Sequence, residues 1–237
     1  MGVDEGIDLD RRIAGVAALD QPLRRDLYRL LVAASGWMTR DDAAGALDIP
    51  QSVAAFHLDK LADAGVVDVC FERVGGRTGP GAGRPSKLYR PARDEVAASV
   101  PDRHYDLAGA LLASAVAESA TTGEPVRDVL RVTARSTGRQ VGEQSRAARE
   151  EAVGDDRRAE FIGVLESHGY EPVTGADDEI ALANCPFHRL AEQQRELVCG
   201  MNLDFLGGVL EGIGPDDHLT ARLDPVPDYC CVRIGPS

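Results

Sequence analysis

Four of the five cysteines in this 237-residue sequence lie close together near its C-terminal end. They are Cys185, Cys199, Cys230 and Cys231, whereas Cys70 lies far from them in the sequence. An odd number of cysteines excludes a complete disulfide framework, and thiolates are soft ligands that suit iron–sulfur clusters and zinc. The grouping therefore predicts a metal or redox site, and we expect Cys70 to be a packing residue.

Cys185 is expected to be an available thiolate. It directly precedes Pro186, a residue favoured at the start of a helix, where free N–H groups and the helix dipole lower the pKa of a thiol. A single helix over 187–198 would, however, hold Cys185 and Cys199 roughly 20 Å apart. Thiolates on one metal ion lie within about 4 Å of each other. Either the helix breaks around Gln193–Glu196, or the two cysteines belong to different sites.

The doubled cysteine lies in the run YCCVRI, which is typical of a strand. Side chains of a strand alternate between its two faces, so Cys230 shares the apolar face with Val232 and Ile234. We therefore expect Cys230 to point into its domain and Cys231 to point away. His188 is a further candidate ligand, the alternative being a solvated histidine on a polar helix.

The first 92 residues have the pattern of a winged helix-turn-helix domain. Helical periodicity recurs over three stretches, residues 21–35, 39–47 and 50–64. Thr39 and Asp42 are placed to form a capping box before the second helix. Two β-prone runs, Val66–Glu72 and Lys87–Arg90, then flank a glycine-rich tip. Three helices followed by a hairpin is the order of the winged helix-turn-helix.

A DNA-reading surface is expected on the third helix and on the hairpin. Ala54, Leu58 and Leu61 recur at helical spacing and should pack inward. Residues 73–90 include five basic residues and no acidic one, and the glycines there allow a tight tip from which arginines can reach a groove. The alternatives are an ordinary solvated helix and a surface loop. The residues expected to contact DNA are Gln51, Ser52, Ala55, Phe56, Lys60, Arg77, Arg84 and Lys87.

Charge is distributed unevenly along the chain, whose net charge is −13. Residues 1–92 carry 12 basic and 13 acidic side chains, whereas residues 93–237 carry 14 and 26. A nearly neutral domain with a basic stripe can bind phosphates, and an acidic second region should be held away from them.

The remaining chain is expected to form two further parts, which gives an α+β fold overall. Residues 93–153 are expected to be a helical linker and dimerisation segment, and residues 154–237 a C-terminal α/β sensor domain that contains the cysteines. One helix, over 104–120, has an apolar face that forms either a dimer seam or part of the core. That face consists of Leu107, Leu111, Leu112, Ala115 and Val116.

Other functional classes are not indicated. We find no nucleophile elbow, P-loop, dinucleotide fingerprint or zinc-protease helix, so an enzyme is not expected. The sequence shows no secretory signal and no run of apolar residues long enough to span a membrane. We therefore expect a cytoplasmic protein with no membrane partner.

Two stretches of sequence resemble known regulators. The phrases LYRLLVAASGWMTRDDAAGAL, SVAAFHLDKLADAGVV and GRPSKLYRP resemble winged-helix regulators of the ArsR-like class. That resemblance covers residues 20–92 and implies a homodimer on double-stranded DNA with an inverted repeat. The phrase NCPFHRLAEQQRELVCGMNLDFLGGVL, followed by YCCVRI, resembles the C-terminal domain of iron–sulfur-assembly (Suf operon) repressors.

Those repressors bind a cluster through three cysteines, so the resemblance implies Cys185, Cys199 and Cys230 as metal ligands. This sequence departs from the pattern in a longer gap after Cys199 and in the doubled cysteine, which makes Cys231 a further candidate for cofactor binding. We therefore expect a dimeric DNA-binding regulator, a repressor, gated by an iron–sulfur cluster, with zinc as the alternative cofactor. A second hypothesis is a winged-helix regulator with a small-molecule pocket, in which the cysteines bind structural zinc or are disulfide-linked.

Overall fold

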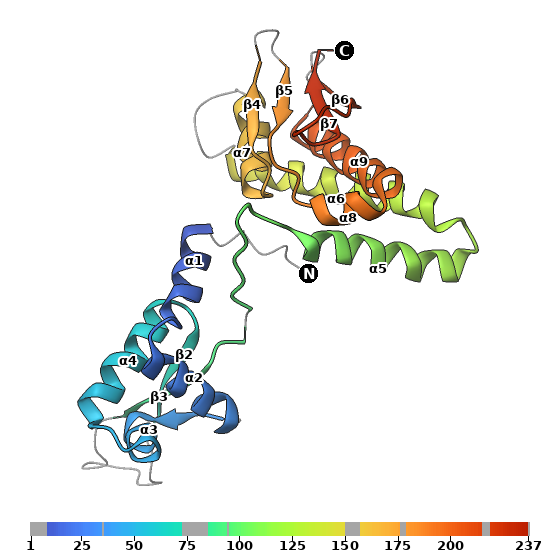
Figure 1. Ribbon diagram of the computed structural model, residues 1–237. Helices are drawn as coiled ribbons and strands as arrows, with labels where there is room; N and C mark the ends of the chain where they lie inside the picture. The colour runs from blue at the N-terminus through green and yellow to red at the C-terminus, as the bar shows by residue number, and fades with distance from the viewer. Residues whose placement is uncertain are drawn as a thin grey trace. The chain divides into compact units, whose positions relative to one another are not determined.

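The computed structural model of the protein describes residues 9–34, 36–72, 85–93, 95–149, 157–175, 179–214 and 219–236. The chain divides into two compact units, Met1–Ala98 and Ser99–Ser237 (Figure 1). The described residues form a three-stranded antiparallel sheet in the first unit and a four-stranded antiparallel sheet in the second. Helices combined with small antiparallel sheets are consistent with the expected α+β class.

The first unit contains the predicted helices and hairpin strands, together with one helix and one two-residue strand that were not predicted. Its elements are α1 (Leu9–Ala18), α2 (Pro22–Ala34), β1 (Met38–Thr39), α3 (Arg40–Leu47), α4 (Gln51–Asp63), β2 (Val67–Glu72) and β3 (Ser86–Pro91). The strands are ordered β1-β3-β2, with Val69 opposite Tyr89. Helix α1 was not predicted, because the large apolar residues Ile13 and Val16 in its middle are exposed and so do not mark a buried stripe.

The core of the first unit lies where α4 packs against α2. Ala54, Leu58 and Leu61 are fully buried, which confirms their predicted inward orientation. The capping box is also confirmed, because the Thr39 side chain accepts a hydrogen bond from Asp42 N and the Asp42 carboxylate accepts one from Thr39 N. These features fix α3 and α4 as a helix pair with α4 exposed on one face.

The second unit contains five helices and four strands among its described residues. They are α5 (Tyr105–Thr122), α6 (Val126–Arg149), α7 (Arg157–Ser167), β4 (Pro172–Thr174), β5 (Ile180–Leu182), α8 (His188–Gln193), α9 (Arg195–Ile213), β6 (Thr220–Leu223) and β7 (Val232–Gly235). The sheet order is β4-β5-β7-β6. Helices α5 and α6 share one hydrophobic core with α7, α9 and the sheet. They lie in residues 93–153, which were expected to form a separate segment.

Helices α6 and α9 pack against each other through four glycines (Figure 1). A Cβ atom on Gly138 would lie 2.0 Å from the carbonyl oxygen of Phe205, and one on Gly142 would lie 2.4 Å from that of Val209. From the other side, Gly208 and Gly212 make equally close approaches to α6. The two main chains therefore touch, and no side chain fits between them. We call this contact the glycine seam.

Ion pairs border the glycine seam. Arginines occur at every fourth position along α6 and face acidic residues of α9. The pairs are Arg127–Glu196 at 2.6 Å, Arg131–Asp204 at 3.1 Å, Arg139–Glu211 at 2.6 Å, and Arg135 with Glu211. Hydrogen bonds from Arg135 and Arg139 lower the pKa of Glu211, against a smaller opposing effect of burial. The arginines therefore help to hold α9 on α6.

The face of α5 that was considered for a dimer seam is used inside the chain. Leu111 is 3% exposed and Ala115 is fully buried, and both belong to the core of the second unit. Val116 of the same face is 58% exposed. Of the two alternatives, core packing therefore holds for Leu111 and Ala115. None of the described helices is both long and apolar enough to cross a membrane.

Candidate functional site

A helix break brings the candidate cysteines together. Helix α8 ends at Gln193 and α9 begins at Arg195, and Gln194 between them has φ −135° and ψ 57°. The single helix over 187–198 is therefore not formed, and the break lies within the range Gln193–Glu196 that one of the two alternatives named. All residues from Glu192 to Glu196 are exposed, so no buried side chain there holds a continuous helix against the core.

A cavity of about 700 Å³ lies beside this break. Its lining includes Arg103, Arg195 and the loop 225–229. It also includes all four C-terminal cysteines, namely Cys185, Cys199, Cys230 and Cys231. Three separate stretches of the second unit therefore place their sulfur-bearing residues around one space.

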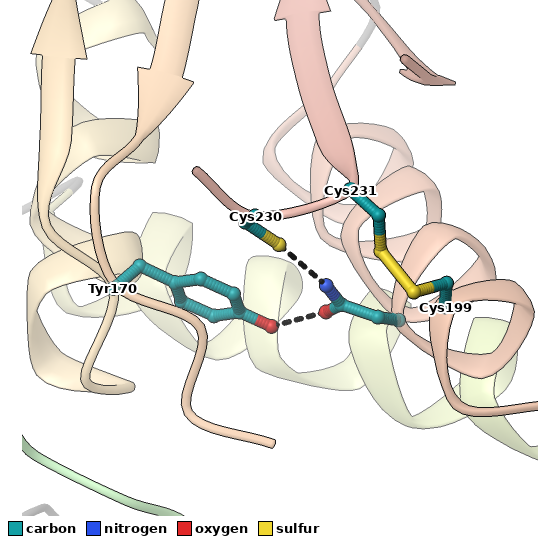
Figure 2. The surroundings of a disulfide bond; sticks show 5 residues. Tyr170, Cys199, Cys230 and Cys231 are labelled. Atoms are coloured by element: carbon teal, nitrogen blue, oxygen red, sulfur yellow. Dashed lines mark hydrogen bonds between the residues drawn. A yellow bond between two sulfur atoms is a disulfide. The ribbon is translucent and has the colours of Figure 1, made fainter. Parts of the chain in front are cut away.

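Two of these cysteines form a disulfide, Cys199–Cys231, with their Cα atoms 6.2 Å apart (Figure 2). Cys199 lies on α9 and is 6% exposed, whereas Cys231 precedes β7 and is half-buried. Cys231 therefore faces α9, and the expectation that it points away is wrong. The expected strand 229–234 begins only at Val232, so strand alternation does not govern the orientation of the doubled cysteine.

The other two cysteines are free thiols in the core. Cys230 is 3% exposed, which agrees with its predicted inward orientation. Its backbone N–H donates to the carbonyl of Leu182 at 2.8 Å, which fixes the doubled cysteine against β5. The side chains of Cys230 and Cys185 are hydrogen-bonded to each other. The structure thus divides four cysteines into a disulfide and a neighbouring thiol pair.

A buried hydrogen-bond chain holds the Cys230 sulfur. The hydroxyl of Tyr170 donates to Asn202 Oδ1, and Asn202 Nδ2 donates to Cys230 Sγ at 3.3 Å (Figure 2). Each of the three residues is less than 4% exposed. Asn202 lies three residues after Cys199 on the same helix. One stretch of α9 therefore contacts both members of the doublet, Cys231 through Cys199 and Cys230 through Asn202.

The two thiols of the pair are affected in opposite directions. The hydrogen bond with Cys230 lowers the pKa of Cys185, burial opposes this, and the Phe187 backbone N–H and the Arg103 charge add to the lowering. The same hydrogen bond, with burial, raises the pKa of Cys230. The predicted direction for Cys185 therefore agrees, although the predicted helix start is wrong. Helix α8 begins only at His188, so Cys185 lies in the turn before it.

The turn that carries Cys185 is tied to residues 102–104, which follow the first unit in the sequence and which we call the connector. Arg103 Nη1 donates to the carbonyl of Cys185 at 3.2 Å and to the side chain of Asn184. The backbone N–H of the connector's histidine donates to Pro186 O at 3.2 Å. A displacement of the Cys185 turn would therefore change the hydrogen bonds that link this turn to the connector.

Side chains that could coordinate a metal ion do not converge on one point among the residues that the structure describes. Among the residues that the structure describes, no three His, Cys, Asp or Glu side chains are placed to hold a single metal ion. His188 lines the cavity, but its Nε2 lies 3.3 Å from Glu192 Oε1 on the exposed side of α8. Cysteine ligands of an iron–sulfur cluster bind different irons, so they need not converge on one point.

The expected DNA-contacting residues of α4 are mostly on its outer face. Gln51, Ser52 and Lys60 are exposed, and Phe56 is 58% exposed. Ala55 is half-buried beside them. Arg77 and Arg84 lie outside the described residues.

Lys87 is placed differently, because it lies on β3 and its Nζ is 2.6 Å from Asp59 Oδ1. The hydroxyl of Tyr89 donates to the same Asp59 oxygen at 2.7 Å. Burial opposes ionisation of Asp59, but the hydrogen bonds from Lys87 and Tyr89 outweigh it and lower the pKa of the carboxyl group. Asp59 thus joins α4 to β3.

Several of these residues were not found by sequence reasoning. Asn202 could have been found, since it and Asp204 are the polar residues in the otherwise apolar stretch MNLDFLGGVL, and buried polar residues require partners. Arg103, Tyr170 and Asp59 carry no such signal, because their roles depend on residues that are distant in the sequence.

A family comparison supports the assignment of the first unit. Residues 19–70 match the family model described as "Helix-turn-helix domain". The chain contains a helix-turn-helix domain. This match fits a winged-helix regulator of the ArsR-like type, and such domains are typical of DNA-binding transcription regulators rather than enzymes. A comparison with curated proteins finds no match.

Proposed function

We propose that this protein is a dimeric repressor that binds an inverted-repeat operator and is gated by an iron–sulfur cluster. The thiolates of Cys185, Cys199 and Cys230 would hold the cluster, with Cys231 beside them. A bound cluster would supply one-electron redox chemistry and sensitivity to oxidants. The observation that carries the proposal is that four cysteines line one cavity in a chain with a helix-turn-helix domain.

The hydrogen bonds of the connector support a route from this site to DNA. Arg103 binds the carbonyl of Cys185 and also binds Asn184, so the position of the Cys185 turn and the course of the connector are linked. The connector leads back along the chain to the helix-turn-helix domain. A change in ligation at Cys185 would alter these hydrogen bonds and with them the relation between the two recognition helices of a dimer.

Thiolate ligation by Cys199 requires the reduced form of the protein, because a disulfide sulfur has no thiolate charge. To test the cluster, the protein should be purified without oxygen and in the presence of a reductant. Its visible absorption spectrum and its content of iron and acid-labile sulfide are then measured. We expect the wild-type protein to be brown. Each of the variants Cys185→Ser, Cys199→Ser and Cys230→Ser should lose this colour, because a hydroxyl is a poor substitute for a thiolate ligand. Cys70→Ser, in the other unit, is the matched control. A colourless, iron-free wild-type protein would refute the cluster.

The disulfide and the cavity favour a second candidate, a regulator that binds a small organic ligand. Ligand pockets usually measure about 300–1,000 Å³, and the cavity beside Cys199–Cys231 lies in this range at about 700 Å³. A colourless preparation whose thermal stability rises with an organic ligand would support this candidate. Zinc without sulfide in the same metal analysis would instead support a structural metal.

The DNA-binding half of the proposal is tested on α4. Lys60→Ala should reduce the slope of log affinity against log salt by about one, because one phosphate contact is lost. Gln51→Ala should weaken binding to the operator more than to unrelated DNA, because amide side chains read base edges. Arg127→Ala, a charge-matched variant in the second unit, should leave the salt slope unchanged. Unaltered binding in both α4 variants would show that α4 does not contact DNA.

The dimer is tested separately by sedimentation. A winged-helix protein on an inverted repeat needs two recognition helices about one turn of DNA apart. We therefore expect a dimer at micromolar concentration. A monomer both with and without cofactor would contradict this part of the proposal.

A further inference from the structure

The Cys199–Cys231 disulfide borders the cavity instead of lying within the core. Residues on either side of it line the same space, from Ala183 to the loop 225–229. Cys231 is half-buried, whereas Cys199 is 6% exposed. Cys231 is therefore the more exposed residue of the pair, and both residues line the cavity.

The exposure of Cys231 and the position of Arg195 meet two requirements of thiol–disulfide exchange. A thiolate attacks one sulfur of a disulfide while the other sulfur departs as a thiolate, so the rate depends on access to the first and on stabilisation of the second. Cys231 is the more exposed residue of the pair, so its sulfur is the one we expect to be attacked. The departing sulfur belongs to Cys199, and Arg195, four residues earlier on α9, also lines the cavity. Side chains four residues apart on a helix are neighbours, and Arg195 and Cys199 both line the cavity, so a positively charged side chain borders the space next to the sulfur that gains negative charge.

We propose that the cavity is an entry site for low-molecular-weight thiols, which reduce Cys199–Cys231 by attack at Cys231 Sγ. In the first step the thiolate of the small thiol forms a bond to Cys231 Sγ, the Cys199–Cys231 bond breaks, and Cys199 leaves as a thiolate. A second small thiol then attacks the mixed disulfide, releases the small disulfide, and leaves Cys231 as a thiol. The small thiols lose two electrons and the protein disulfide gains them.

Reduction would change what the cavity can bind, and this consequence rests on the proposed cluster. The oxidised protein offers the thiols of Cys185 and Cys230 to the cavity, whereas the reduced protein adds those of Cys199 and Cys231. Only the reduced form has the three thiolates that the proposed cluster requires. The supply of small thiols would then decide whether the site can be loaded.

The test follows the disulfide itself in the full-length, cofactor-free protein. Air-exposed protein is incubated with 2-mercaptoethanol under native conditions, quenched with acid, alkylated in denaturant, and weighed by mass spectrometry. We expect alkylation of Cys70, Cys185 and Cys230 before reduction, and of all five cysteines after it. An early mixed disulfide should map to Cys231. Five free thiols in the air-exposed protein, or reduction only after unfolding, would overturn the proposal.

A pair of tryptophan variants tests entry through the cavity. Ala183 is exposed and lines the cavity, so Ala183→Trp should fill its space and slow reduction by 2-mercaptoethanol several-fold. Ala113→Trp adds the same side chain to an exposed position on α5 outside the cavity lining and should leave the rate unchanged. Circular dichroism confirms that both variants are folded. Equal rates in the two variants would overturn the proposal, as would reduction by a dithiol protein that Ala183→Trp does not slow and that far outpaces the small thiol.

A final arm separates this proposal from the proposed cluster. In Cys231→Ser, Cys199 has lost its disulfide partner, so cluster reconstitution should no longer depend on prior reduction. If reduction by the small thiol proceeds as expected but neither the wild type nor Cys231→Ser takes up iron and sulfide, the entry site is supported and the proposed cluster is refuted. If both proteins load equally well without a thiol, the disulfide does not control the site.

Discussion

Two regions of the second unit are held together in opposite ways. At the glycine seam the main chains of α6 and α9 touch, and ion pairs close its edge. Around the cavity, the cysteines lie on a turn, on α9 and on the chain before β7. One disulfide joins Cys199 to Cys231, and hydrogen bonds from side chains such as Asn202 and Arg103 contact the other two. The seam leaves no room for an added atom, whereas each bond around the cavity can be exchanged by itself. A close-packed helix pair therefore lies next to a cavity whose surrounding bonds can be exchanged.

The largest effect is expected from adding one methyl group to the seam. A Cβ atom at Gly208 would lie 2.1 Å from the carbonyl oxygen of Arg135, which is main chain and cannot rotate away. Gly208→Ala should therefore lower the free energy of unfolding by about 3 kcal/mol, at the upper end of ordinary overpacking. Urea denaturation measures this loss.

The neighbouring glycine provides the control. A Cβ atom at Gly207 would meet only the end of the Arg135 side chain, at 3.5 Å. Gly207→Ala should be neutral or stabilise the protein by about 0.5–1 kcal/mol, because alanine favours helix over glycine. Similar unfolding curves for the two variants would show that the helices are not in main-chain contact.

A smaller effect is expected from breaking the hydrogen-bond chain behind Cys230. Asn202→Ala would leave the Tyr170 hydroxyl and the Cys230 sulfur without their partner in a buried site, which should cost about 1–3 kcal/mol. Tyr170→Phe removes only the hydroxyl and should cost less, because Asn202 keeps its bond to Cys230. Thermal unfolding with the disulfide intact measures both variants. A greater loss for Tyr170→Phe would contradict this order.

The smallest effect concerns pH and the edge of the seam. Because hydrogen bonds from Arg135 and Arg139 lower the pKa of Glu211, ionised Glu211 stabilises the fold above its unfolded-state pKa. This contribution is lost as pH falls through the lowered folded-state pKa, which lies below the ordinary value of 4.5. Glu211→Gln should therefore cost up to about 1 kcal/mol near pH 7, since the pair is partly screened by solvent.

The difference between Glu211→Gln and the wild type should shrink as the solution is made more acid than the ordinary glutamate pKa. Denaturant midpoints between pH 7 and pH 3 follow this change. Glu196→Gln is the matched control, because Glu196 is 82% exposed in its pair with Arg127 and should contribute less. A difference that grows toward acid pH would reverse the sign of the argument.

The first unit was largely predictable because its signals are local. Leu58 and Leu61 repeat at helical spacing, and Thr39 lies three residues before Asp42, so sequence separation alone identified the core face and the cap. Helix α1 escaped because it buries small residues such as Gly15 and Ala18. A pattern of large apolar residues cannot indicate a helix of that kind.

The sequence predicted which cysteines lie close together, but not which of them form a disulfide. The four residues could be grouped from their closeness in the sequence, and the helix break was one of two alternatives that the length of one straight helix left open. The pairing of Cys199 with Cys231 depends on how α9 approaches the chain before β7, and such connectivity cannot be deduced from spacing. The same holds for Arg103, whose partners at 184 and 185 lie some eighty residues away in the sequence.

Asp59 has a consequence for redesigning DNA specificity. Recognition helices are natural targets for exchange between related domains, but the proposed recognition helix α4 also supplies the acceptor for the hydroxyl of Tyr89, which is 1% exposed on β3. A transplanted helix that lacks Asp59 would leave that hydroxyl without its hydrogen-bond acceptor and would remove the link between the helix and the hairpin. A retargeted domain should therefore keep Asp59 and vary only outward positions such as Gln51, Ser52 and Lys60.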